Sequence, residues 1–227
     1  MEPIRKSRRK TVRNVHAFEN EKFDQLQGIW AETMGTPEKY GFWVVYGPEK
    51  HGKTTFNLKL AKMLSEHAKV LYISAEEGFS ENFKHTMERL NIGPNTKNLL
   101  FEDEKLTISE IEGEFVYMKG GKEVSRRNPV EIVIIDNMTV YTDILKKSVV
   151  DKVFEKWKKN KLFIFICHEE GKELVGAAAK QAKRLATLLF RVEGLAAHVS
   201  GRCPGGEISI DDERAALYHG NSILQTK

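Results

Sequence analysis

The sequence predicts an α/β fold with a mostly parallel, twisted sheet that is flanked by helices. Apolar runs that suit strands alternate with amphipathic segments that suit helices, and this alternation favours a parallel sheet covered on both faces. A glycine-rich turn joins the first apolar run to an amphipathic segment. Four short strand-like segments follow near the C-terminus, and we expect them to form antiparallel strands at that edge of the sheet.

The core strands are expected at the most apolar runs, 42–46, 70–74, 99–102, 132–136 and 162–167. Helical spacing of apolar residues predicts helices at 21–34, 54–68, 81–91, 138–147, 149–159 and 176–187. The antiparallel edge strands are expected at 189–192, 197–199, 207–210 and 215–218. A hairpin at 115–118, turning at Gly120 and Gly121, interrupts the alternation.

Size and composition indicate one domain. The chain has 227 residues, of which 41% are hydrophobic, so it is long enough for a single sizeable core. We expect a basic arm at 1–20 and one domain at 21–227, with its core at about 40–220. The two cysteines suit neither a metal motif nor a disulfide framework, which favours a reducing, cytoplasmic location. No run approaches the ~18 apolar residues of a membrane span, so we expect no membrane association.

The turn after the first strand matches a phosphate-binding loop. Its candidate nucleotide ligands are Gly47, Pro48, Glu49, Lys50, His51, Gly52, Lys53, Thr54 and Thr55. A glycine-rich turn between a strand and a helix points backbone N–H groups and the helix N-terminus at one spot, which suits triphosphate oxygens. Lys53 would contact the β- and γ-phosphates, and the Thr54 hydroxyl would bind Mg²⁺. The sequence therefore predicts a site for ATP and Mg²⁺.

Acidic residues at two predicted strand ends are candidates for the chemistry of hydrolysis. Asp136 ends an apolar strand and could hold Mg²⁺ through its water shell, although an aspartate there can also cap the next helix. Glu76 follows the strand at 70–74 and could orient the attacking water as general base. Glu77 is the alternative base, and the two glutamates could instead be a pair of surface acids. We expect these carboxylates to meet the phosphate loop in one pocket.

The first thirteen residues are strongly basic and contain only one acid, Glu2. The cations are Arg5, Lys6, Arg8, Arg9, Lys10 and Arg13. Such a block cannot bury itself, so we expect it to be disordered when free. Its side chains could bind the phosphates of DNA, or the arm could be a solvated tail.

Four stretches of the sequence resemble the RecA and RadA recombinases, and together they cover roughly residues 40–220. They are the phosphate loop at 47–55, the segment 70–77 with the catalytic glutamate, 134–137 and 162–168. The resemblance implies a RecA-like P-loop ATPase core of the small stand-alone type found in phages and mobile elements.

The same resemblance implies roles for three further residues. His168 stands where the family has its γ-phosphate sensor, although a strand-end histidine can be merely structural. Arg202 lies in a segment that reaches the nucleotide of the next subunit in related proteins, which makes it a candidate finger in trans. Tyr218 lies where a tyrosine packs on the adenine, and its alternative role is that of an edge-strand core aromatic.

These observations favour a Mg²⁺-dependent ATPase that acts on DNA in recombination, strand annealing or replication. We expect a homo-oligomer with ATP between subunits, and a recombination or replication protein as a potential partner. A regulatory ATP switch that controls a transposase, helicase or nuclease is the alternative, and a small-molecule kinase is less favoured.

The segment 169–174, where recombinases have a DNA-binding loop, is short and more acidic than basic. Other cations would therefore have to contact DNA, namely the arm, Arg126, Arg127, Lys180, Lys183 and Arg184.

Overall fold

A twisted sheet lies at the centre of the computed structural model, which describes residues 10–76, 78–111, 114–119, 122–127, 130–141 and 146–211. The strand order is β11-β10-β9-β1-β7-β6-β2-β3, and β8 pairs with the end of β7. These strands are β1 (Gly41–Gly47), β2 (Val70–Ser74), β3 (Leu99–Glu102), β6 (Ile132–Asp136), β7 (Leu162–Glu170), β8 (Glu173–Leu174), β9 (Leu188–Glu193), β10 (Ala196–Gly201) and β11 (Gly206–Ser209). The pairs from β9 to β3 are parallel, and β10 and β11 add antiparallel strands at the C-terminal edge, as predicted.

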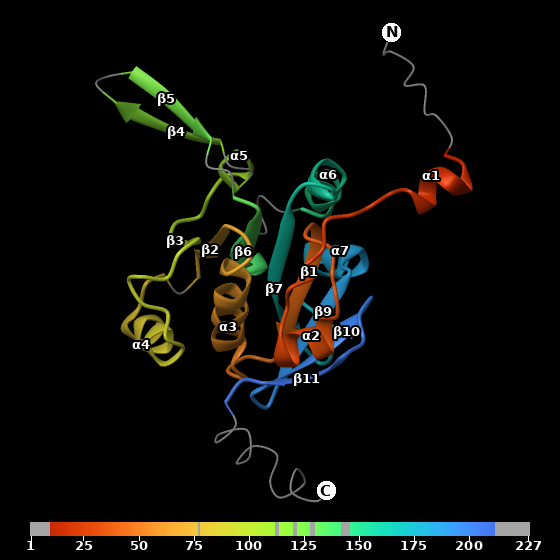
Figure 1. Ribbon diagram of the computed structural model, residues 1–227. Helices are drawn as coiled ribbons and strands as arrows, with labels where there is room; N and C mark the ends of the chain where they lie inside the picture. Colours follow the sequence, from red (N-terminus) through yellow and green to blue (C-terminus); the bar gives the residue numbers. More distant parts are fainter. Residues whose placement is uncertain are drawn as a thin grey trace, which may run out of the picture.

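Helices cover both faces of the sheet, and the layers can be followed in Figure 1. The described helices are α1 (Val12–His16), α2 (Gly28–Met34), α3 (Lys53–Ser65), α4 (Glu81–Arg89), α5 (Ile108–Ile111), the 3₁₀ helix η1 (Met138–Tyr141), α6 (Lys147–Trp157) and α7 (Ala177–Leu185). Buried residues of α2, α3 and α4 belong to one core cluster, whereas those of η1, α6 and α7 belong to a second cluster. The sheet therefore separates two hydrophobic cores.

Strand β1 shows why the sequence forms a sheet buried on both faces. Trp43 and Val45 point into the first cluster, and Phe42 and Val44 point into the second. All four side chains have no exposed surface. Because successive side chains of a strand point to opposite faces, a strand covered on both sides must be apolar at every position.

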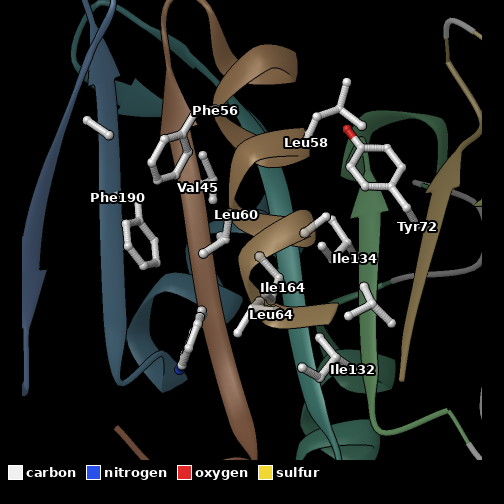
Figure 2. Packing of buried hydrophobic residues seen from close by; sticks show 14 of the residues in the cluster. Val45, Phe56, Leu58, Leu60, Leu64, Tyr72, Ile132, Ile134, Ile164 and Phe190 are labelled. Atoms are coloured by element: carbon white, nitrogen blue, oxygen red, sulfur yellow. The ribbon is translucent and has the colours of Figure 1, made fainter. Parts of the chain in front are cut away.

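Helix α3 anchors the first core behind the phosphate loop. Its apolar side chains lie against isoleucines of β6 and β7 (Figure 2), and the residues in contact come from Leu58, Leu60, Leu64, Ile132, Ile134 and Ile164. Each buried leucine or isoleucine contributes about 2 kcal/mol through removal of its surface from water. This packing fixes the N-terminus of α3, and with it Lys53, relative to the strand ends.

The predicted helix at 21–34 is wrong over its first half. Only Gly28–Met34 is helical, while Lys22 forms an antiparallel bridge with Glu38. The Phe23 N–H donates to the Pro37 carbonyl at 2.8 Å, and the Phe23 side chain is buried. The apolar spacing that suggested a helix is thus satisfied by an extended segment that packs on the core.

Two further expectations need correction. The predicted helix at 138–147 is a single 3₁₀ turn at Met138–Tyr141, and residues 142–145 lie outside the described part. Strand β9 was expected to be antiparallel, but it pairs in parallel with β1 because α7 carries the chain back across the sheet after β7.

The predicted hairpin is confirmed as β4 (Glu114–Lys119) and β5 (Lys122–Arg127), which form a separate two-stranded sheet (Figure 1). Within the predicted basic arm, Thr11 caps the short helix α1, all of whose residues are exposed. The expected edge strand at 215–218 lies outside the described residues. None of the helices in the described ranges is long and apolar enough to cross a membrane.

Candidate nucleotide-binding site

The phosphate loop connects the end of β1 to the start of α3, as its motif predicts. Gly52, just before the helix, has a φ of +96°, a left-handed conformation that favours glycine. Gly47 meets a different constraint, because a Cβ atom there would lie 2.0 Å from the Val192 carbonyl oxygen. The loop therefore rests directly on the backbone of β9.

Lys53 points back into its own loop. Its Nζ donates to the carbonyl oxygens of Gly47 at 2.9 Å and Pro48 at 2.6 Å, and the residue is only 8% exposed. Burial lowers the pKa of Lys53, and the negative charges of Asp136, Glu49 and Glu76 oppose that shift. A buried ammonium held by neutral carbonyls next to several carboxylates is well suited to receive phosphate oxygens.

Asp136 ends β6 and lies opposite Ser74 of the neighbouring β2. The Tyr72 hydroxyl donates to Asp136 Oδ2 at 2.6 Å, and this bond fixes the carboxylate at the mouth of the loop. The sequence analysis did not assign a role to Tyr72. The available signal was a tyrosine inside an apolar strand, since a buried tyrosine hydroxyl usually needs a hydrogen-bond partner.

Glu76 lies beside two polar residues from neighbouring strand ends. The Asn137 side-chain amide donates to Glu76 Oε2, and His168 Nε2 lies 3.6 Å from Glu76 Oε1. Asn137 is almost completely buried, whereas 43% of the Glu76 side chain is exposed. The carboxylate is thus held at its inner side and open toward the pocket. Glu77, the alternative base, lies outside the described residues.

One cavity of about 430 Å³ brings these groups together. Its lining includes Lys53, Thr54, Glu76, Asp136 and His168, which the sequence placed in separate motifs. Glu49, Lys50, Gly52 and Thr55 of the loop also line it. The carboxyl ends of parallel strands are the usual ligand-binding edge of such sheets, and the cavity lies at that edge.

The residues present fit a magnesium nucleotide. Thr54 and Asp136 supply two oxygen ligands, and Mg²⁺ in nucleotide sites commonly takes the rest from phosphates and water. Within the described ranges, no group of three or more His, Cys, Asp or Glu side chains could hold a metal by itself. His168 Nδ1 is buried without a hydrogen-bond partner among the described residues, and this suits a site whose polar groups are completed by a ligand.

Other predicted residues lie elsewhere. His51 lies outside the lining of the cavity and accepts a hydrogen bond from the Gly194 N–H at 3.0 Å. Arg202 is exposed near the start of β1, where it lines a different hollow with Tyr40 and Gly41. Tyr218 and the arm residues Arg5, Lys6, Arg8 and Arg9 lie outside the described part, while Lys10 and Arg13 are exposed.

The remaining candidate DNA contacts are only partly available. Lys180 pairs with Glu173, and Lys183 lies 4.0 Å from the centre of the Tyr46 ring, so two of the three cations on that helical side have partners within the protein. Arg126 and Arg127 lie in β5, and only their backbone is described.

The sequence matches no protein-family model and none of the curated proteins. Among solved structures, the flagellar accessory protein FlaH from Methanocaldococcus jannaschii is 16% identical, aligns over 83% of this chain and 91% of its own, and has a TM-score of 0.54. The ATPase domain of a helicase is 16% identical over 75% of this chain and 81% of its own, with a TM-score of 0.47. The ATP synthase subunit NeqB from Nanoarcheaum equitans is 12% identical over 76% and 52%, with a TM-score of 0.48.

The likeness to FlaH concerns the arrangement of the elements, since the sequence identity is low. It agrees with the features described above, namely a phosphate loop after the first strand, a mostly parallel sheet and antiparallel strands at the C-terminal edge. This chain has the fold of the RecA-like P-loop ATPases.

Proposed function

We propose that this protein is a Mg²⁺-dependent ATPase that acts on DNA. The observation that carries the ATPase part is the convergence of Lys53, Thr54, Glu76 and Asp136 on one cavity. A loop that binds triphosphate, an oxygen pair for a metal and a carboxylate for water are the parts that phosphoryl transfer to water requires.

The roles follow from where each group lies. Lys53 would leave its loop carbonyls and neutralise charge on the β- and γ-phosphates, and Thr54 and Asp136 would hold the metal. Mg²⁺, when bound, supplies charge neutralisation on the phosphate oxygens. Glu76, open toward the cavity, would orient a water molecule and accept its proton. His168 lies close enough to Glu76 to report whether the terminal phosphate is present.

Replacing Lys53 tests the proposed site. We expect Lys53→Ala to lower ATP turnover by about 10²-fold or more, because an electrostatic contact to the transition state is lost. Lys84→Ala, on the exposed side of α4, is the matched control and should hydrolyse ATP like the wild type. Phosphate release measured with and without Mg²⁺ is the assay. Unchanged turnover in Lys53→Ala would show that the site is assigned wrongly.

The DNA part of the proposal is supported by the basic N-terminal segment and by the resemblance of the motifs to recombinases. Phosphate contacts release counterions, so DNA-stimulated turnover should fall steeply as salt rises. A turnover rate that ignores single-stranded and double-stranded DNA at low salt would exclude this role.

One observation favours a second candidate, a regulatory ATP switch. Strand β7 continues past His168 and pairs with β8 in a tight hairpin, and Glu169, Glu170 and Glu173 make this hairpin acidic. An ordered acidic hairpin beside the site suits a protein partner better than DNA.

Deleting residues 1–13 separates the two candidates. Loss of DNA stimulation with normal basal turnover would favour the DNA-acting enzyme. Unchanged DNA response together with lost binding to a co-purified transposase, helicase or nuclease would favour the switch.

A further inference from the structure

Asn137 joins the two groups that would act on the terminal phosphate. It follows Asp136 at the carboxyl end of β6 and is only 1% exposed. Its side chain contacts Glu76 from the segment after β2 and His168 from β7. A buried amide at this place is costly unless its donors and acceptor all find partners.

The orientation of the Asn137 amide is fixed by the next turn. The Thr139 N–H donates to Asn137 Oδ1 at 2.6 Å, and the Thr139 hydroxyl also donates to this oxygen. The oxygen of the amide therefore faces Thr139, and the amino group must face the other way, toward Glu76 and His168. A flipped amide would set its amino group against the Thr139 N–H, two donors facing each other.

The two hydrogens of that amino group have two acceptors. One hydrogen goes to Glu76 Oε2, and the other faces His168 Nε2, 2.5 Å from the amide nitrogen. Because an amide NH₂ can only donate, His168 Nε2 must carry its lone pair, which places the ring proton on Nδ1. While this contact holds, Nε2 cannot donate a hydrogen bond to a phosphate oxygen.

We propose that Asn137 is a positioning residue that orients Glu76 toward the attacking water and holds His168 in the Nδ1–H form through a single shared amino group. This inference rests on the proposed ATPase function and names a further residue of that site. Asn137 acts through Glu76 and His168, and its contribution to turnover is the geometry that it gives them.

Kinetics of a variant test the link to Glu76. Asn137→Ala should lower kcat by about 10-fold to 100-fold, the range expected when a reacting group loses its support, with the affinity for a non-hydrolysable ATP analogue unchanged. In a Glu76→Gln background the same substitution should have little further effect, because residues that act as a unit are not additive. Thr139→Ala is the control: its backbone N–H still fixes the amide, so turnover should stay near that of the wild type. An Asn137→Ala enzyme with wild-type turnover, or an equal loss in both backgrounds, would overturn the inference.

The ring tautomer of His168 gives a readout that needs no activity. In ¹⁵N-histidine-labelled protein at about pH 9, where imidazole is neutral, the His168 nitrogens should report the Nδ1–H form in the wild type. They should shift toward the Nε2–H form in Asn137→Ala, and His168→Gln identifies the resonances. A wild-type Nε2–H form would contradict the proposed contact. If the tautomer behaves as expected but the wild type does not hydrolyse ATP, the proposed function fails while the assigned contact stands.

Discussion

Single atoms decide much of how the phosphate loop is built. Gly47 has no Cβ because the Val192 carbonyl occupies that space, and Lys53 is buried because its ammonium finds two carbonyls of the same loop. Tyr72 places its hydroxyl on Asp136 in the same way. Each of these contacts positions a group of the cavity without depending on bound nucleotide.

The close approach at Gly47 predicts a large loss of stability in Gly47→Ala. A Cβ 2.0 Å from a backbone oxygen cannot be relieved by a side-chain rotation, so β1 and β9 must separate at a cost of about 3 kcal/mol. Gly93→Ala is the matched control, because nothing lies within 4 Å of its Cβ position. Urea unfolding measures both. Equal stability of the two variants would mean that β9 does not press on the loop.

The two cysteines should differ in reactivity. Burial raises the pKa of Cys167 to about 12, so its thiol stays protonated, and it lies fully inside the second core. Cys203 is only partly buried, although burial raises the pKa of its thiol as well. Iodoacetamide at about pH 8 should therefore modify Cys203 slowly and leave Cys167 intact until the protein unfolds. Mass spectrometry of the native protein checks this, and labelling of Cys167 first would contradict it.

At the level of strands, an ion-pair network ties the ends of β7 and β9 together beside the site. Arg191 Nε donates to both carboxylate oxygens of Glu169, at 3.2 and 3.1 Å, and Arg191 also pairs with Glu193. The Glu169 side chain is 3% exposed. Because His168 precedes Glu169 on β7, this network holds the strand that carries the proposed sensor.

Arg191→Ala should cost about 3 kcal/mol of unfolding free energy, because it leaves the Glu169 carboxylate buried without its partner. The exposed pair between Lys180 and Glu173 provides the control, and Lys180→Ala should change stability by less than about 1 kcal/mol. Chemical denaturation of both variants makes the comparison. A stability loss no larger than that of the control would show that water already solvates Glu169.

Strand and helix patterns predicted the fold class because each core strand is apolar on both faces and each helix is amphipathic. They did not predict the extended segment around Phe23, since an apolar residue every three or four positions fits either a helix or a chain laid across a core. The loop residues and Asp136 came from local motifs. The contacts of Tyr72 and Asn137 depend on which strand ends lie side by side, such as Ser74 opposite Asp136, and local sequence does not contain that register.

For the whole molecule, the position of Arg202 limits how subunits could meet. The Arg202 N–H donates to the Thr187 carbonyl, and the Thr187 N–H donates to the Phe42 carbonyl, both at 2.8 Å. Arg202 therefore lies at the start of β1, whereas the phosphate loop follows its end. Seven residues of strand span about 20 Å, which is too far for Arg202 to reach nucleotide in its own subunit. A finger role requires a head-to-tail assembly in which the start of one sheet faces the carboxyl edge of the next.

Mixing two inactive variants tests that assembly. Lys53→Ala subunits lack a working loop but keep Arg202, and Arg202→Ala subunits keep the loop but lack the arginine. Each variant alone should turn over ATP poorly. In an equimolar mixture, an interface that pairs an intact loop with an intact Arg202 forms with a chance of about one quarter in a closed head-to-tail assembly, so activity should return to roughly that fraction of the wild type. If the mixture stays as inactive as its components, or if Arg202→Ala alone works like the wild type, Arg202 does not act across subunits.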